Sequence, residues 1–244
     1  YNGTLRLVLE CWNRDATRTE NYLVVLDDDM KVLSQTEPFG ETETVESVRF
    51  SENLCYVVTF YQTDPLFVFD LTDPANPVKR GELKLPGFSA YLHPAGEGYM
   101  VGIGQDGTDD GLNGGAKISL FDVSDPENPV EADKIVLSEG WFDSDHKSFI
   151  TRGENGFIVT FCEWKGDKRG ALYFTVEDGR LVEQSRSIVP ENCVNTEKAL
   201  FINDILFLYA TWDYFSDTDD AYVSGEGLFS YDIISGEMLG RIEL

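Results

Sequence analysis

The chain has 244 residues, of which 42% are hydrophobic and 13% aromatic, so it can bury a core and is not composed like a disordered segment. Its formal net charge of −25, from 44 acidic and 19 basic residues, argues against nucleic acid and against anionic membrane surfaces as partners. The acidic excess serves either solubility or cation binding in loops. No apolar run reaches the ~18–20 residues of a membrane span, so we expect no membrane insertion by this segment.

Predicted strands fill the chain in five consecutive segments. Short runs of β-branched and aromatic residues between turn residues are typical of strands, and no helical period persists beyond one turn. Segment 1–40 supplies three strands, at 4–10, 21–27 and 31–39, and lacks an innermost one. The other segments supply four each: 47–50, 54–60, 66–71 and 79–85 in segment 41–86; 89–93, 99–105, 117–123 and 131–137 in segment 87–138; 146–151, 156–164, 170–177 and 181–189 in segment 139–190; and 197–202, 205–212, 227–234 and 237–244 in segment 191–244.

A repeated decapeptide supports this division. FDLTDPANPV at 69–78 returns as FDVSDPENPV at 121–130, with seven of ten positions identical. In each copy an Asp closes the strand, because its carboxylate can accept hydrogen bonds from amides just downstream. Two prolines then keep the strand ladder from continuing. The same strand-closing position is occupied by Asp27, Asp70, Asp122 and Asp232 in four of the segments.

The spacing of the segments favours a β-propeller. Four-stranded antiparallel units of about 40–55 residues, repeated radially, are typical of propeller blades. We predict an all-β fold: one β-propeller domain of about five four-stranded antiparallel blades, the first incomplete. Because the chain starts inside a blade, we expect an excerpt of a larger propeller. A β-sandwich is the alternative, but it gives no reason for the roughly constant period.

Several motifs in the third segment occur together in one known family. The run GYMVGIGQDGTDDGLNGGAKISLFDVSDPENPVEADKIVL is followed closely by DSDHKSF. This order resembles the bacterial and archaeal secreted or surface-anchored proteins with a C-terminal β-propeller domain distantly related to WD repeats. Ser148 stands where that family usually has Ala, and the family's propeller domain is longer than this chain. The resemblance implies a propeller fold and an extracytoplasmic, secreted or surface-anchored location; it implies no chemistry.

Long predicted loops between the second and third strands of the blades form the expected working face. They span 11–20, 105–116, 164–169 and 212–227, and in a propeller such loops gather on one side. Aromatic and acidic loops suit recognition of a protein or a glycan; alternatively, the rings only pin the loops to the blade tops. The candidate binding residues are Trp12, Trp164, Trp212, Tyr214, Phe215 and Tyr222.

The motif DGTDDG suggests a calcium site. Asp106, Thr108 and Asp110 place oxygen side chains at relative positions 1, 3 and 5, with Gly111 at 6, as a calcium loop begins. At position 12, however, Lys117 replaces the bidentate Glu. Calcium is the one cofactor that we consider, and Gly/Asp-rich turns without metal are the alternative.

Residues just before the first strands could ring the mouth of a central channel. When the predicted blades are aligned, Phe88 falls at the same position as Glu46. His93 falls in a predicted turn instead. His146, a single histidine next to Asp145, is more typical of a structural hydrogen-bond partner than of a catalyst. The candidates are Glu46, His146, Lys147, Glu197 and Lys198.

Four dispersed cysteines exclude a zinc knuckle and a CxxC redox site. Cys55 and Cys162 fall in predicted strands, where buried thiols are the simplest interpretation. A Cys11–Cys55 disulfide is the alternative, and the disulfide state of Cys193 is also left open by the sequence.

The functional prediction is a secreted or cell-surface binding scaffold that uses the loops of one face, with a protein or glycan as partner. The sequence contains no nucleophile elbow, HExxH, Walker or dinucleotide-binding motif. The alternative is an extracellular, glycan-acting hydrolase with carboxylates on the loop face or at the channel mouth. Two carboxylates in one pocket, one with a raised pKa, would favour that alternative.

Overall fold

The structure is a computed structural model that describes residues 2–15, 17–61, 63–108, 111–142, 149–165, 167–191, 193–216 and 221–244. These residues form strands, turns and irregular segments without a helix, which confirms the predicted all-β class. Accordingly, this part of the chain offers no helix with the length and apolar character to cross a bilayer.

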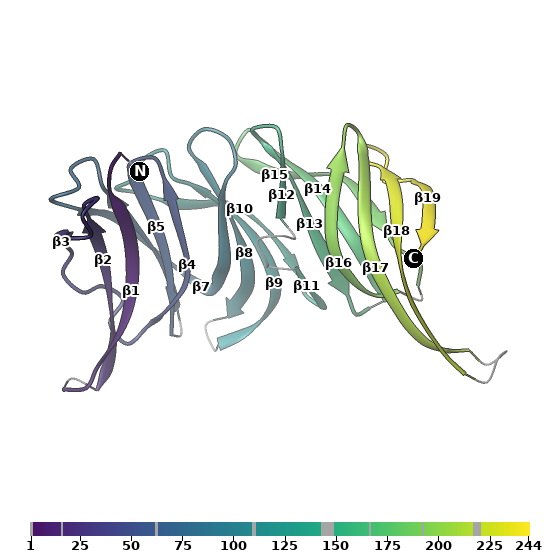
Figure 1. Ribbon diagram of the computed structural model, residues 1–244, viewed down its shortest axis with the longest axis horizontal. Helices are drawn as coiled ribbons and strands as arrows, with labels where there is room; N and C mark the ends of the chain where they lie inside the picture. Colours follow the sequence, from purple (N-terminus) through teal and green to yellow (C-terminus); the bar gives the residue numbers. More distant parts are fainter. Residues whose placement is uncertain are drawn as a thin grey trace. The chain divides into compact units, whose positions relative to one another are not determined.

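Nineteen strands of the described residues form four sheets (Figure 1). The first sheet has the order β1-β2-β3, with strands Leu5–Asn13, Arg18–Leu26 and Val32–Gln35. The second runs from β10 back to β4 and contains Thr44–Ser51 (β4), Leu54–Phe60 (β5), Thr63–Asp70 (β6), Val78–Pro94 (β7), Tyr99–Thr108 (β8), Gly111–Asp122 (β9) and Val130–Leu137 (β10). The third has the order β11-β13-β14-β15, with β12 also on β13, and contains Gly140–Phe142 (β11), Phe149–Arg152 (β12), Gly156–Glu163 (β13), Lys168–Glu177 (β14) and Arg180–Ile188 (β15). The fourth has the order β16-β17-β18-β19 and contains Cys193–Ile202, Ile205–Ser216, Ala221–Asp232 and Met238–Glu243.

The predicted strand-closing role of the aspartates is confirmed. At all four positions carboxylate oxygen Oδ1 accepts a hydrogen bond of 2.8–3.0 Å from the amide two residues downstream. Three of the four are the last residue of their strand. Arg80 donates two further hydrogen bonds to Asp70, at 2.8 and 3.2 Å. The Thr72 hydrogen bonds, followed by those from Arg80, hold the pKa of Asp70 below its usual range.

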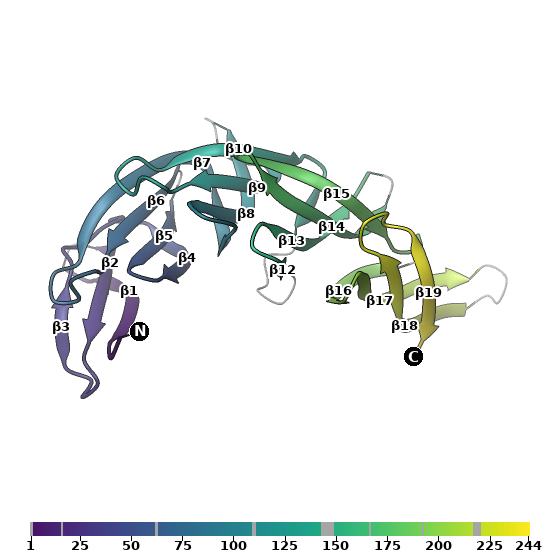
Figure 2. The same cartoon turned by 90° about the horizontal axis from the view of Figure 1, so that it is seen from above.

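One strand, β7, runs where two were predicted, at 79–85 and 89–93 (Figure 2). The half before Gly87 pairs with β6, and the half from Gly87 onward pairs with β8. Gly87 has φ +88°, and a Cβ there would lie 2.2 Å from the carbonyl oxygen of Gln105. The Pro-Gly dipeptide is therefore a kink inside a strand, at the point where the strand changes partner, and not a turn.

The predicted long loops are mostly strand. β1 and β2 pair as far as Asn13↔Arg18, β13 and β14 as far as Glu163↔Lys168, and β17 and β18 as far as Ser216↔Ala221. The candidate aromatic residues therefore lie on or beside the ends of β-hairpins. In the third sheet β11 and β12 both pair with β13. The described part of the predicted strand 146–151 is β12, and residues 146–148 lie outside the described residues.

Two compact units divide the chain: residues 1–114 with 119–132, and residues 115–118 with 133–244. In the first unit β5 is buried on both faces, with Cys55 and Val57 in one cluster and Tyr56 and Val58 in another. Burial on both faces explains why this strand is apolar almost throughout. The second unit is held by a cluster from β13, β14 and β16–β18 that includes Ile158, Tyr173, Leu206, Leu208, Phe229 and Tyr231.

All four cysteines are free, so the Cys11–Cys55 alternative is wrong. Cys11 is exposed, whereas Cys55, Cys162 and Cys193 are buried, which confirms the two predicted buried thiols. Burial raises the pKa of Cys55 strongly. The prediction that His93 lies in a turn is also wrong, since it lies within β7.

Candidate binding groove and the predicted aromatic face

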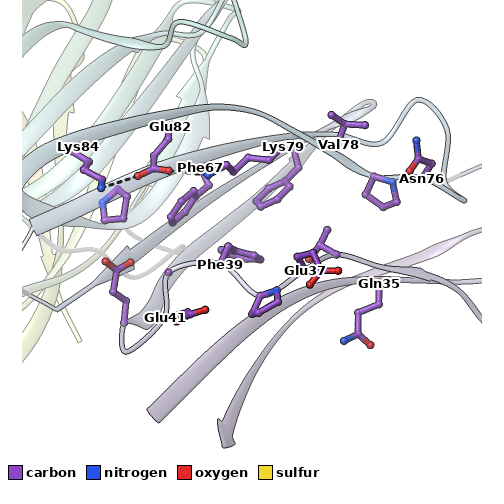
Figure 3. A pocket seen from close by; sticks show the side chains of 17 residues that line it. Gln35, Glu37, Phe39, Glu41, Phe67, Asn76, Val78, Lys79, Glu82 and Lys84 are labelled. Atoms are coloured by element: carbon purple, nitrogen blue, oxygen red, sulfur yellow. Dashed lines mark hydrogen bonds and ion pairs between the residues drawn. The ribbon is translucent and has the colours of Figure 1, made fainter. Parts of the chain in front are cut away.

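A groove of about 800 Å³ in the first unit lies between the segment that follows β3 and strands β6 and β7 (Figure 3). Its origin is the length of β3. This strand stops after four residues, and the chain then continues as an irregular segment to β4. Side chains of β6 and the first half of β7 line the other side of the groove.

Buried Asn21 fixes the segment 36–43 that forms one wall. Its side-chain nitrogen donates hydrogen bonds to the carbonyl oxygens of Gly40 (3.0 Å) and Glu43 (3.1 Å). The backbone carbonyl oxygen of Asn21 accepts a hydrogen bond from the backbone amide of Phe39 at 3.0 Å. Gly40 has φ +52°, and a Cβ there would meet the Glu43 carboxylate at 2.8 Å, so glycine suits the turn. The wall is therefore preformed.

Three phenylalanines form the apolar floor. The ring centroid of Phe39 lies 5.3 Å from that of Phe67 and 4.8 Å from that of Phe69. All three belong to one core cluster, so the floor is continuous with the core of the first unit. The Nζ atom of Lys79 lies 5.3 Å from the Phe67 ring centroid, in cation–π range.

Charge differs between the two walls. Glu37, Glu41 and Glu43 line the wall after β3. Glu41 pairs with Arg18 at 2.6 Å, and Glu43 accepts a short hydrogen bond from the Thr59 hydroxyl.

The β7 wall carries a lysine–glutamate–lysine triad. Lys79 and Lys84 both pair with Glu82, at 2.9 and 3.1 Å (Figure 3). Burial tends to raise the pKa of Glu82, but hydrogen bonds from the two lysines outweigh it and lower that pKa. The lysines are thereby neutralised in part, which leaves the groove acidic on balance.

The predicted aromatic residues differ in what they contact. Trp12, Trp164 and Tyr222 are 62%, 63% and 78% exposed. Trp212 is partly buried, packs edge-on against Phe229 and covers Gly225, where a Cβ would lie 2.7 Å from its ring. This ring therefore stabilises its own hairpin, as the alternative interpretation has it.

The side chains of Tyr214 and Phe215 lie outside the described part of the structure. Sequence reasoning missed Trp141, which contacts Trp164 at a centroid distance of 5.9 Å. Trp12 belongs to the first unit and the other described rings to the second, so a single shared face stays a prediction.

Two of the predicted channel-mouth residues, Glu46 and Glu197, lie at register shifts of their strands. Register shifts skip Glu46 where β4 pairs with β5, and Glu197 where β16 pairs with β17. A register shift in β7 likewise skips Ala90 where β7 pairs with β8, and the alignment of Phe88 with Glu46 stays a prediction. Glu46 accepts a hydrogen bond from the Thr44 hydroxyl at 3.1 Å, and Lys198 is exposed. His146 and Lys147, and the side chain of Glu197, fall outside the described residues.

The calcium hypothesis is not resolved by the described residues. Asp106 lies in β8, but Asp110 and the side chain of Thr108 are outside them. Lys117, at the position of the bidentate Glu, is 1% exposed in β9. Among described residues no group of three His, Cys, Asp or Glu side chains could hold a metal ion. Calcium at this hairpin stays a prediction.

No sequence motif pointed to the groove. Its floor joins Phe39 from an irregular segment to two residues of β6, a pairing that depends on tertiary packing. The available signal was the sequence EPFG at 37–40, in which Pro38 ends any strand just before an apolar ring.

Comparison with known proteins identifies the family. Residues 1–211 match the family model of the beta propeller domain. An uncharacterised protein of Archaeoglobus fulgidus is 33% identical over 248 residues, which cover all of this chain and 34% of that protein. An uncharacterised protein of Methanocaldococcus jannaschii is 37% identical over 213 residues, 86% of this chain and 32% of that protein. The chain thus spans about a third of the length of these curated relatives.

A solved structure agrees in fold. Hydrazine synthase of Kuenenia stuttgartiensis superposes with a TM-score of 0.55 at 12% identity, over 94% of this chain and 64% of that one. The predicted fold and resemblance are confirmed, while the number of blades stays a prediction. The family model matches residues 1–211, which is most of this chain. The chain therefore belongs to the beta propeller domain family.

Proposed function

We propose that this domain is a binding scaffold whose groove takes an extended, apolar-basic segment of a partner protein. The propeller fold supports a general role in interaction, since such domains offer rigid surfaces without requiring chemistry. The groove is the single observation that carries the finer proposal. Its volume of about 800 Å³ suits several side chains of a peptide.

The chemistry of the groove suggests the kind of segment. The phenylalanine floor suits an apolar side chain, because burying it against aromatic rings removes apolar surface from water. The glutamates of the wall after β3 favour a Lys or Arg next to that residue. The net charge of −25 draws basic partners over longer distances as well.

Calorimetric titration with short synthetic peptides tests this proposal. One set carries Leu or Phe flanked by Lys, and its matched set carries Glu in place of Lys. We expect saturable binding of the basic set alone. Glu37→Lys reverses the charge of an exposed wall residue and should weaken binding about two- to fivefold.

Glu154→Lys is the matched control, because Glu154 is an exposed turn residue of the second unit. It makes the same charge change away from the groove and should leave the affinity unchanged. Equal binding of both peptide sets, or equal loss in the two variants, would show that the groove does not select basic segments.

The carboxyl groups give the hydrolase alternative no support. Wherever a pKa shift is resolved for a described carboxyl group, the pKa is lowered by hydrogen bonds or ion pairs: Glu20, Asp70, Glu82, Asp125 and Asp232. A general acid for glycoside hydrolysis needs a raised pKa instead.

A further inference from the structure

A small pocket in the second unit, separate from the groove, has unsatisfied hydrogen-bonding capacity. It has a volume of about 160 Å³ and lies between β13, β14 and the start of β16, with Trp141 of β11 at its side. Three buried polar atoms of its lining residues have no hydrogen-bond partner in the described part of the chain: Thr160 Oγ1, Arg169 Nε and Thr196 Oγ1. Unsatisfied buried donors are costly, so three around one pocket indicate a ligand or ordered water that accepts hydrogen bonds.

The lining is held rigidly. Arg169 Nη1 donates to Asp167 Oδ1 at 2.5 Å and to the carbonyl oxygen of Cys193 at 3.1 Å, so the guanidinium cannot swing away without losing both. A Cβ on Gly140 would lie 2.0 Å from the carbonyl oxygen of Cys162, a close approach that fixes β11 against β13. The pocket is therefore preorganised, which lowers the entropy cost of binding.

The charges favour a neutral acceptor over an anion. Asp167 already balances the positive charge of Arg169, and the Arg169 side chain is only 15% exposed. A buried carboxylate or phosphate would add a negative charge without a counterion. An amide carbonyl oxygen accepts hydrogen bonds from Arg169 Nε and a threonine hydroxyl without that cost.

One exposed tryptophan, Trp141, lines the pocket, and a second, Trp164, contacts it. Trp141 and Trp164 are 42% and 63% exposed, with ring centroids 5.9 Å apart and planes at 54°. Tryptophan rings at the edge of a small polar pocket suit a ring that has one apolar face and carries a polar substituent. A pocket of this size has room for about five water molecules or for one acetamido group.

We propose that this pocket binds the acetamido group of an N-acetylhexosamine, with the sugar ring against Trp141 and Trp164. The acetamido carbonyl oxygen accepts hydrogen bonds from Arg169 Nε and from the Thr160 hydroxyl. The site therefore gives the scaffold a glycan-binding function in addition to the peptide groove.

The test is tryptophan fluorescence titration of the chain with N-acetylglucosamine, repeated with glucosamine, glucose, acetate and N-acetyl-lysine. We expect saturable quenching by N-acetylglucosamine and none by glucosamine or glucose, which lack the carbonyl. Stronger binding of acetate would make the pocket an anion site, and equal binding of N-acetyl-lysine would remove the role of the sugar ring; either result overturns the proposal. Absence of saturation by N-acetylglucosamine also overturns it and leaves water as the occupant.

Variants locate the binding. Thr160→Val keeps the side-chain shape, removes an unsatisfied hydroxyl and should weaken binding about three- to tenfold while the unfolding midpoint is kept or raised. Trp164→Ala should weaken binding as well. Trp12→Ala is the matched control, since that ring is equally exposed but belongs to the first unit. Unchanged affinity in Thr160→Val and Trp164→Ala, with the same saturable quenching, would place the sugar elsewhere.

Discussion

His93 is the described residue whose protonation is most clearly tied to folding. Its ring stacks on Tyr91 at a centroid distance of 6.0 Å, and its Nδ1 lies 3.0 Å from the tyrosine hydroxyl oxygen. Burial, followed by the positive charge of Arg49, lowers the pKa of His93 from 6.5 to about 4. Between these two values the unfolded chain binds a proton that the folded chain does not.

The free energy of unfolding should therefore fall as the pH drops from about 6.5 to about 4, and this contribution should level off below 4. We expect a loss of about 1–2 kcal/mol from His93, because the half-buried site is partly screened by solvent. Urea denaturation at pH 7 and pH 4.5 measures it. His93→Gln should remove that part of the pH dependence, and an identical pH dependence in the variant would contradict the assignment.

At the scale of elements, local chemistry predicted the strands better than their connections. The aspartates and prolines of the repeated decapeptide ended strands as expected, because both act through their own backbone and nearest amides. The hairpin ends were mistaken for loops because their sequences are mostly polar and show no alternation of apolar and polar residues. Trp12 and Thr19, for example, pair across the first hairpin. The groove could not be predicted, since Phe39 meets Phe67 only in the folded unit.

The kink of β7 offers a test of this element. Gly87→Ala should lower the free energy of unfolding by about 2–3 kcal/mol, because it adds a backbone clash to an unfavourable positive φ. Gly153→Ala is the matched control: its φ is +69°, but a Cβ there meets nothing within 4 Å. We expect the control to lower the free energy of unfolding by only about 1 kcal/mol. Chemical denaturation measures both, and equal losses would mean that Gly87 is needed for its φ alone.

At the scale of the whole molecule, each compact unit leaves apolar sheet surface exposed. In the fourth sheet Leu200, Ile202 and Ile242 are 50%, 59% and 63% exposed. Pairing of Leu200 with Phe207, and of Ile242 with Leu228, puts apolar residues along one face. In the first sheet Leu5 and Leu9 of β1 are 42% and 41% exposed. Apolar surface of this kind favours association.

We therefore expect this chain to self-associate at high salt, where its net charge of −25 is screened. Sedimentation velocity over a range of concentrations should show the association. The double variant Ile202→Lys, Ile242→Lys should reduce it with little change in unfolding free energy, because both side chains are exposed. Ile234→Lys, 57% exposed in the turn after β18, is the control and should still associate. A concentration-independent monomer in the parent chain would contradict the expectation.

Because β7 is continuous, a protease is expected to cleave the chain first at other sites. Cleavage requires several residues of backbone to leave their hydrogen-bond partners and enter the protease cleft. Lys79, Arg80 and Lys84 have exposed side chains, yet their backbone belongs to a strand that passes from one partner to the next without an intervening loop. Arg14 and Lys165 lie in the turns of two hairpins. Brief digestion with trypsin should therefore cut after Arg14 and Lys165 first, as mass spectrometry of the fragments would show. Cleavage within β7 should follow only much later.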